Sequence, residues 1–184
     1  MDITLVIRGE VGQGINTISY LLLKVLKTGL FAFSCEDIMS RIRGGINTTT
    51  IRISEKYNCR FKKEIDILVP LDPKVGDWVK SRLTPNIIIL NEEKINPSKI
   101  KKELEKPVFL NTFLAGLITR IFNIDFSFFK SVIEEIFYLK GKEAIEKNLL
   151  AAKKGYDLGN GLNINLSIKN QIFQNGYYSR DLKH

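Results

Sequence analysis

Histidine and cysteine are scarce in this sequence. The single histidine is His184, the last residue, and the two cysteines, Cys35 and Cys59, fall in separate segments. A histidine-based catalytic triad, proton shuttle or zinc site therefore has no internal histidine to use. Two isolated cysteines form neither a disulfide framework nor a CxxC motif, so we expect reduced thiols. Nor can they hold an iron–sulfur cluster that needs four thiolates.

Long hydrophobic runs are also missing. The longest, such as Ile87–Leu90, fall far short of the roughly 20 apolar residues that a membrane-spanning helix needs. The N-terminal segment lacks the pattern of a signal peptide, because the chain opens directly into a strand pattern at Ile3. We therefore expect a cytoplasmic protein without membrane association.

The composition is otherwise that of an ordinary globular domain. The 184 residues are 44% hydrophobic and 26% charged, and one core is the default at this length. The net charge of +8 favours an anionic partner, such as nucleic acid, a phosphorylated cofactor or an acidic protein surface. The lysines are spread over predicted helix faces without interleaved aromatic residues, so we do not expect nucleic-acid binding.

Strand-like and helix-like segments alternate along the chain. Ile3–Ile7 is a short apolar run followed by a glycine-rich turn, after which apolar residues recur at helical spacing. Leu30–Cys35 predicts a second strand, which a right-handed crossover would place beside the first as its parallel neighbour. Ile46–Ser54 is rich in β-branched residues and predicts a third strand, with Tyr57–Phe61 as a candidate hairpin partner.

The remaining segments continue the alternation. Strands are predicted at Ile65–Leu71, Asn86–Leu90 and Pro107–Leu110, and helices at Lys74–Arg82, Lys99–Glu105, Thr112–Phe122, Phe128–Leu139 and Lys142–Lys154. Gly155 is expected to cap the last helix, and a composition rich in Gly, Asn and Ser from Gly159 marks a boundary. Leu166–His184 either packs back on the domain or docks on another chain.

This order of elements predicts an α/β fold. We expect a doubly wound, mostly parallel sheet with helices on both faces, a Rossmann-like three-layer arrangement. The domain is expected to cover residues 1–158, with 159–184 as a C-terminal extension or linker.

A glycine-rich turn follows the first predicted strand. It reads Gly9-x-x-Gly12-Gln13-Gly14, which is GxxGxG and not the dinucleotide fingerprint GxGxxG, so a standard nicotinamide site is not expected. Glycines permit positive φ and close approach of the backbone, and the N–H groups at a helix start favour an anion. The turn predicts either a phosphate or carboxylate site, or tight packing of the helix on the sheet. No Walker lysine follows, which argues against nucleotide hydrolysis.

A basic glycine pair precedes the third predicted strand. The segment reads Ser40-Arg41-Ile42-Arg43-Gly44-Gly45-Ile46-Asn47. Arginines bind phosphates or carboxylates through two parallel hydrogen bonds, and glycines let a ligand or another subunit approach the backbone. A basic surface turn without a ligand is the alternative interpretation.

Together, the two segments resemble a known family. The glycine turn and, about 30 residues later, Ser40-Arg-Ile-Arg-Gly-Gly-x-Asn-Thr48 are similar to motifs in the gamma domain of 2-oxoacid:ferredoxin (or other acceptor) oxidoreductases. Ile65–Val69 resembles a strand of that domain, Asn111 falls where the family has an asparagine before a glycine-containing helix, and Asn148–Tyr156 resembles its closing helix. The resemblance spans roughly residues 3–158 and looks closest to the variant fused in front of a thiamine-pyrimidine-binding domain.

The resemblance implies that the chain is one component of a thiamine-dependent enzyme. In the family a 2-oxoacid such as pyruvate is decarboxylated on thiamine diphosphate, electrons leave through iron–sulfur clusters to ferredoxin, and the acyl group passes to coenzyme A. This chain has Gly76-Asp77-Trp78 in place of the Gly-Asp-Gly that anchors the metal of thiamine diphosphate. Thiamine diphosphate, Mg and 4Fe–4S clusters are therefore expected on partner chains, namely thiamine-binding α and β subunits and a ferredoxin-type subunit, or on further sequence beyond His184.

For this chain the resemblance implies support of the thiamine-binding subunits and a contribution to coenzyme A binding. It implies no catalytic or metal-binding residue and no activity of the isolated chain. The candidate coenzyme A residues are expected to line one cleft at the carboxyl ends of the first strands: Gly9, Gly12, Gln13, Gly14, Ser40, Arg41, Arg43, Gly44, Gly45 and Asn47. Two alternatives stay open, a stand-alone Rossmann-like nucleotide- or anion-binding protein and a purely architectural subunit.

Overall fold

The structure is a computed structural model with an α/β fold. It describes residues 1–10, 14–27, 29–37, 46–57, 60, 62–72, 76–96, 100, 104, 109–162, 164 and 166. The strands are β1 (Asp2–Glu10), β2 (Phe31–Asp37), β3 (Ile46–Ser54), β4 (Ile65–Pro70) and β5 (Leu83–Ile89). The helices are α1 (Ile15–Leu26), α2 (Asp77–Lys80), α3 (Glu92–Ile95), α5 (Phe109–Ile121), α6 (Phe126–Phe137) and α7 (Lys142–Gly161), with a 3-10 turn, η2 (Tyr138–Lys140), between the last two.

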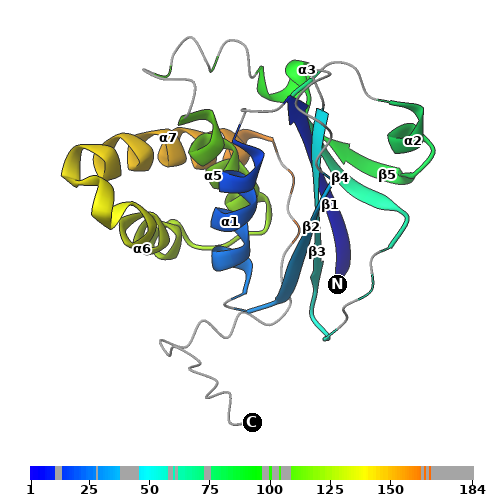
Figure 1. Ribbon diagram of the computed structural model, residues 1–184, viewed down its shortest axis with the longest axis horizontal. Helices are drawn as coiled ribbons and strands as arrows, with labels where there is room; N and C mark the ends of the chain where they lie inside the picture. Colours follow the sequence, from blue (N-terminus) through cyan, green and yellow to red (C-terminus); the bar gives the residue numbers. More distant parts are fainter. Residues whose placement is uncertain are drawn as a thin grey trace.

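The five strands form one mixed sheet in the order β2-β3-β1-β4-β5. β1, β4 and β5 pair in parallel, whereas β3 is antiparallel to both β1 and β2. Four strands therefore run in one direction and β3 alone is reversed. The predicted mostly parallel sheet with helices on both faces is confirmed (Figure 1).

The prediction that the first two strands are neighbours is wrong, because β3 lies between them. Only residues 38–45 join β2 to β3. A parallel crossover needs a dozen or more residues, so a link this short forces β3 to return antiparallel to β2. The suggestion of Tyr57–Phe61 as a hairpin partner also fails, because β1 and β2 already occupy both edges of β3.

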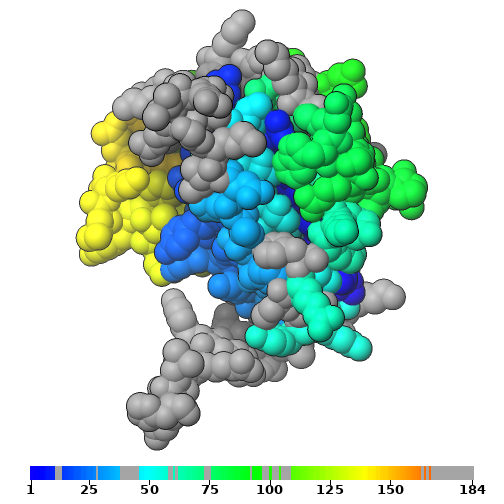
Figure 2. Space-filling view, turned by 45° about the vertical axis from the view of Figure 1, so that its right-hand side comes forward, coloured from blue at the N-terminus to red at the C-terminus, as the bar shows by residue number. Residues whose placement is uncertain are grey.

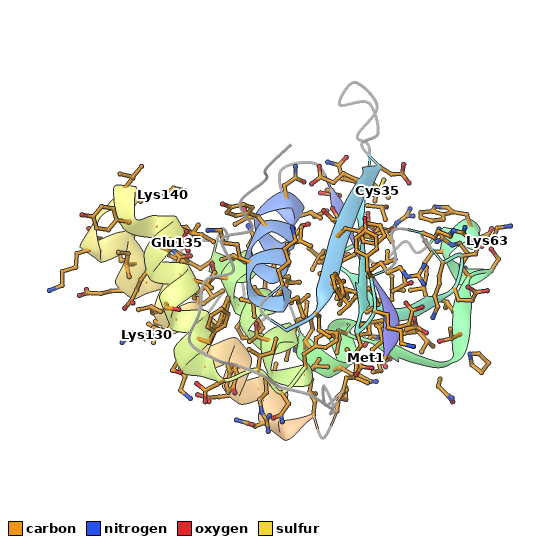
Figure 3. All side chains as sticks on the ribbon, turned by 90° about the horizontal axis from the view of Figure 1, so that it is seen from below. Met1, Cys35, Lys63, Lys130, Glu135 and Lys140 are labelled. Atoms are coloured by element: carbon orange, nitrogen blue, oxygen red, sulfur yellow. The ribbon has the colours of Figure 1, made fainter. Side chains whose placement is uncertain are left out.

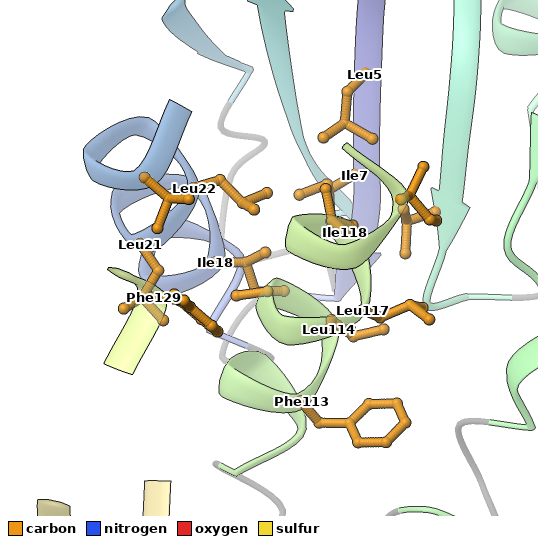
Figure 4. Close-up of a cluster of buried hydrophobic side chains, with 14 of the residues drawn as sticks. Leu5, Ile7, Ile18, Leu21, Leu22, Phe113, Leu114, Leu117, Ile118 and Phe129 are labelled. Atoms are coloured by element: carbon orange, nitrogen blue, oxygen red, sulfur yellow. The ribbon is translucent and has the colours of Figure 1, made fainter. Parts of the chain in front are cut away.

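Alternate residues of β1 face two different layers. Leu5 and Ile7 belong to the main core, which β1 shares with α1, α5 and α6 (Figure 4). Val6 faces the other way, into a smaller cluster that includes Val79 of α2. Figure 2 shows residues 77–95 (green), which carry α2, β5 and α3, and α6 (yellow) on opposite sides of β1, β2 and β3. Full burial of each large apolar side chain contributes about 1.5–3 kcal/mol, so the thicker helical layer supplies most of the core.

The predicted strand at Pro107–Leu110 is wrong in its second half, because Phe109 and Leu110 form the first turn of α5. Short apolar runs do not distinguish a strand from a buried helix, and these two residues continue the helical spacing of Phe113 and Leu117. This apolar stripe is buried in the main core, where α5 packs mainly on α7 and α1.

Gly155 does not end the last helix as predicted, because α7 continues to Gly161. Its role is a close contact: a Cβ added to Gly155 would lie 1.9 Å from the backbone oxygen of Phe113 in α5. Gly116 of α5 has the matching role, with an added Cβ 2.2 Å from the backbone oxygen of Ala152. The glycines therefore let the two helices approach until their backbones touch.

The other elements lie close to their predicted positions. β3 has the predicted bounds, α2 lies within Lys74–Arg82, and β5 begins earlier than Asn86. The helix predicted at Lys99–Glu105 falls mostly outside the described residues, although the N–H of Leu104 donates to the carbonyl of Ile100 at 2.9 Å, as in a helical turn. Beyond α7, the N–H of Leu166 donates to the carbonyl of Ile121 at 2.8 Å, so the chain packs back there. The domain division at residue 158 stays a prediction.

Candidate functional site

The two glycine segments singled out in the sequence leave the sheet from directly opposed residues. In the β1–β3 pairing Gly9 lies opposite Asn47, and Glu10 lies opposite Ile46. The turn that follows Glu10 and the basic segment that precedes Ile46 are therefore attached side by side at one edge of the sheet. This is the edge at which β1 and β4 end and α1 begins (Figure 1).

Three of the candidate site residues lie in the described part of the chain: Gly9, Gly14 and Asn47. Gly9 and Asn47 are the paired residues at the edge, and Gly14 is the N-cap of α1. Their proximity to the same edge follows from the pairing and the short connection. The others lie outside the described residues, so their contacts stay a prediction: Gly12, Gln13, Ser40, Arg41, Arg43, Gly44 and Gly45.

Gly14 begins α1 in a left-handed conformation, with φ 70° and ψ 29°. Its carbonyl accepts the first helical hydrogen bonds, from the N–H groups of Thr17 at 2.9 Å and Ile18 at 3.3 Å. No side chain of the described residues caps this end, and the first turn of α1 carries no acidic residue. The first turn of α1 therefore offers no acidic side chain of its own to the positive end of the helix dipole, which favours an anion there.

Asn111 is a residue of this site that the candidate set does not include. It lies in the first turn of α5, is 3% exposed, and packs so closely on α1 that a Cβ added to Gly14 would be 1.9 Å from its Nδ2. This contact, together with the positive φ, explains why a glycine is required at position 14. The only sequence signal for Asn111 was its place in the family resemblance.

Two buried amide oxygens near this edge have no hydrogen-bond partner within the described structure: Oδ1 of Asn111 and Oδ1 of Asn47. Leaving a buried polar atom unpaired costs roughly 1–3 kcal/mol, so such atoms are uncommon without a functional reason. Asn47 occupies the same face of β3 as Ile51 and Ile53, which face α1 and α5. Both amides therefore lie in the layer that contains the start of α1.

The Gly76-Asp77-Trp78 segment does not form a metal site in this fold. The side chain of Asp77 is 98% exposed and pairs with Lys80 at 3.3 Å. Across the described ranges, no group of three His, Cys, Asp or Glu side chains comes together as metal ligands would. Cys35 is an exposed free thiol (Figure 3), and Cys59 lies outside the described residues.

None of the described helices is both long enough and apolar enough to cross a membrane.

Comparison with known proteins places these features in a family. A model of the pyruvate ferredoxin/flavodoxin oxidoreductase family matches residues 4–158. No curated protein sequence gave a match. Similar folds occur in solved structures. The pyruvate oxidoreductase subunit PORC from Thermotoga maritima aligns with a TM-score of 0.61 and 18% identity, over 85% of this chain and 96% of that one.

Two further structures have the same fold. The gamma subunit of a keto/oxoacid ferredoxin oxidoreductase from Geobacter sulfurreducens has a TM-score of 0.67 and 14% identity, over 88% of this chain and 98% of that one. The 2-oxoglutarate:ferredoxin oxidoreductase from Magnetococcus marinus, solved with 2-oxoglutarate, coenzyme A and succinyl-CoA bound, has a TM-score of 0.72 and 20% identity over 89% of this chain. This chain spans 32% of that longer one.

Proposed function

Because the chain belongs to the pyruvate ferredoxin/flavodoxin oxidoreductase family, we propose that it is the gamma-type component of a complex that decarboxylates a 2-oxoacid oxidatively to an acyl-CoA. Its part in that reaction is to help bind coenzyme A and to support the thiamine-binding subunits. The chain has no activity in isolation. The residues that carry the proposal are those of the two glycine segments and, in addition, Asn111.

The observation that supports this proposal most strongly is the pairing of Glu10 with Ile46. It attaches the glycine turn and the Arg41–Gly45 segment at adjacent points, close to an α1 N-terminus that has no acidic residue in its first turn. Coenzyme A carries several phosphate groups, and phosphates bind to helix N-termini and to arginines. In this proposal both kinds of group serve one ligand at this edge of the sheet.

The unpaired amide oxygens of Asn47 and Asn111 support the same site. Phosphates accept hydrogen bonds, so these oxygens are not phosphate ligands, but each amide group also carries two N–H donors. The amide orientation of an asparagine is assigned from its hydrogen bonds, and a bound ligand with its own donors and acceptors would satisfy both ends. We assign these two residues to the polar, non-phosphate part of the ligand.

The remaining chemistry belongs to partner chains in this proposal. Thiamine diphosphate with its Mg ion, and the 4Fe–4S clusters, are held by α, β and ferredoxin-type subunits. The residues described here do not fit these groups, because Asp77 is exposed and already paired with Lys80 and because Cys35 is an exposed single thiol.

Calorimetric titration of coenzyme A into the assembled complex tests the proposal. We expect Arg43→Ala to weaken binding about tenfold or more, since a hydrogen-bonded charge pair contributes roughly 1.5–3 kcal/mol. Lys130→Ala is the matched control, because it removes one positive charge from α6, away from the sheet (Figure 3). An unchanged affinity in the Arg43 variant rules out Arg43 as a direct ligand.

Two simpler functions predict different results. A stand-alone nucleotide- or anion-binding protein would purify without larger subunits that contain iron and thiamine diphosphate, whereas the proposed component co-purifies with them. A purely architectural subunit would also co-purify, but neither Arg43→Ala nor Asn111→Ala would change the affinity of the complex for coenzyme A.

A further inference from the structure

Arg8 is a buried arginine that forms no ion pair with a carboxylate of the described residues. It lies near the end of β1, opposite Thr48 of β3 and beside Pro70 of β4, and is 8% exposed. Its Nε is fully enclosed and has no hydrogen-bond partner in the part of the chain that the structure describes. A guanidinium carries five N–H donors and stays charged, so burying it without a paired acceptor is costly.

The surroundings of Arg8 are aromatic and cationic. Its guanidinium carbon lies 5.6 Å from the ring centre of Trp78, and that of Arg82 lies 5.4 Å from the same ring. A Cβ added to Gly76 would be 3.5 Å from Nη2 of Arg8, so the backbone at the start of α2 borders the guanidinium. The positively charged side chains of Arg8 and Arg82 therefore both contact the indole ring of Trp78, which is 40% exposed.

Nearby groups engage Arg82 but do not neutralise this cluster. The backbone carbonyls of Lys62 and Lys63 accept hydrogen bonds from Arg82. Two carboxylates on this face have other partners: Asp66 accepts from the N–H of Thr4 at 2.8 Å, and Asp77 pairs with Lys80 at 3.3 Å. A third, the buried Asp72 that follows β4, also has an interaction of its own and forms no ion pair with Arg8 in the described chain. Among the described residues, no ion pair of Arg8 is formed. Cation–π attraction to Trp78 is weaker than a hydrogen-bonded charge pair, so it does not replace an ion pair for the buried Arg8.

We propose that Arg8, Trp78 and Arg82 form a binding subsite for an oxyanion, a phosphate or a carboxylate group. Arg8 supplies the N–H donors of its two Nη atoms, since its Nε is enclosed, and Arg82 supplies a second positive charge. The indole holds both guanidinium groups in place. The bound anion would pair the buried charge and relieve the repulsion between the two arginines. This subsite is one that neither the family resemblance nor the glycine motifs predicted.

The subsite is distinct from the proposed coenzyme A site. Arg8 follows the alternation of β1 onto the α2 face, as Val6 does, whereas Gly9 and the start of α1 belong to the opposite face. The two sites lie on opposite faces of the same sheet edge. The occupant of the Arg8 subsite is either a free phosphate-bearing ligand or a carboxylate side chain of a partner protein.

Trp78 makes the subsite directly observable, because it is the only tryptophan in the chain. Its fluorescence would be recorded while the full 184-residue chain is titrated with inorganic phosphate, pyrophosphate or acetate at constant ionic strength. We expect a saturable change in the wild type. Arg8→Gln should weaken the response about tenfold or more, the effect of losing a charge-assisted pair.

Lys63→Gln is the matched control, because it removes one charge from an exposed position on the same side of the sheet, opposite Lys130 and Lys140 (Figure 3). It should leave the titration unchanged within about twofold. Arg8→Lys keeps the charge without the two parallel donors, and is expected to bind with intermediate affinity. If far-ultraviolet circular dichroism shows that Arg8→Gln does not fold, Arg8→Lys replaces it in the comparison with the wild type.

The possible results distinguish the two kinds of occupant, and they distinguish failure of the Arg8 subsite from failure of the coenzyme A proposal. Tighter binding of phosphate or pyrophosphate indicates a phosphate-bearing ligand, and tighter binding of acetate indicates a protein carboxylate. The subsite is overturned if the wild type shows no saturable fluorescence response to any of the three anions. It is also overturned if the Arg8→Gln and Lys63→Gln variants bind the anion with the same affinity as the wild type. None of these results depends on Arg43, so failure of the coenzyme A proposal would be recognised separately.

Discussion

Replacing Gly14 with alanine should destabilise the fold through two separable effects. The first is backbone strain, because Gly14 has φ +70° and a left-handed conformation costs an L-residue about 1–2 kcal/mol. The second is steric, because the new Cβ would lie 1.9 Å from Nδ2 of Asn111, a side chain that is only 3% exposed. Asn111 must then leave its place, which adds about 1 kcal/mol or more for an overpacked buried contact. We expect a total loss of about 2–4 kcal/mol.

A double-mutant cycle isolates the steric part. Unfolding in urea would be measured for the wild type, Gly14→Ala, Asn111→Ala and the double variant. Asn111→Ala removes the side chain that the new methyl meets, so the double variant should be less destabilised than the sum of the single changes by about 1 kcal/mol or more. Gly141→Ala is a control for positive φ without a steric contact, since Gly141 has φ +86° and nothing lies within 4 Å of an added Cβ. Its ψ of 168° differs from the 29° of Gly14, so it tests the presence of strain and not its size.

The outcome also tests the site. Additivity within about 0.5 kcal/mol would mean that Gly14 and Asn111 are not in contact. In that case the close approach of α5 to the start of α1, on which the assignment of Asn111 rests, would be wrong. A loss for Gly14→Ala below about 0.5 kcal/mol would contradict the left-handed conformation as well.

Two further predictions concern the packing of the helices and the pH dependence of stability. Gly155→Ala should destabilise the chain by about 1–3 kcal/mol, because the added Cβ would lie 1.9 Å from the backbone oxygen of Phe113. Gly161→Ala is the control on the same helix, because an added Cβ there meets nothing within 4 Å. It should be neutral or stabilising by up to about 1 kcal/mol. The urea midpoints of the two variants would be compared, and equal losses of stability would contradict the α5–α7 packing. The Arg52 side chain donates to Asp2 and holds the pKa of that carboxyl below its ordinary value. The stabilisation is therefore fully present above about pH 4 and is lost as the pH falls through the lowered pKa. Asp2→Asn should cost a modest amount of stability at neutral pH and progressively less in acid, and a cost that persists down to pH 2 would be inconsistent with this linkage.

Local patterns were sufficient for much of the fold. The β-branched run predicted β3 with its observed bounds, Ile46–Ser54, because threonine and isoleucine fit a pleated, half-buried surface. Where local patterns are ambiguous, the prediction failed. The apolar pair Phe109–Leu110 suits a strand or a buried helix, and Gly155 suits a helix end or a close helix contact. In both cases the packing of α5 against α7 decided which structure the residues adopt.

The sequence by itself determined the family and the two segments that distinguish it, since motif order and spacing are properties of the chain alone. Only the tertiary structure decided that β3 separates β1 from β2, that Glu10 faces Ile46, and that Asn111 closes over Gly14. That Nε of the buried Arg8 has no hydrogen-bond partner among the described residues also emerged only there, because a strand pattern does not reveal which groups surround a side chain. The physical reason is that pairing register and side-chain contacts join residues far apart in the chain, and burial around them is set by the whole fold.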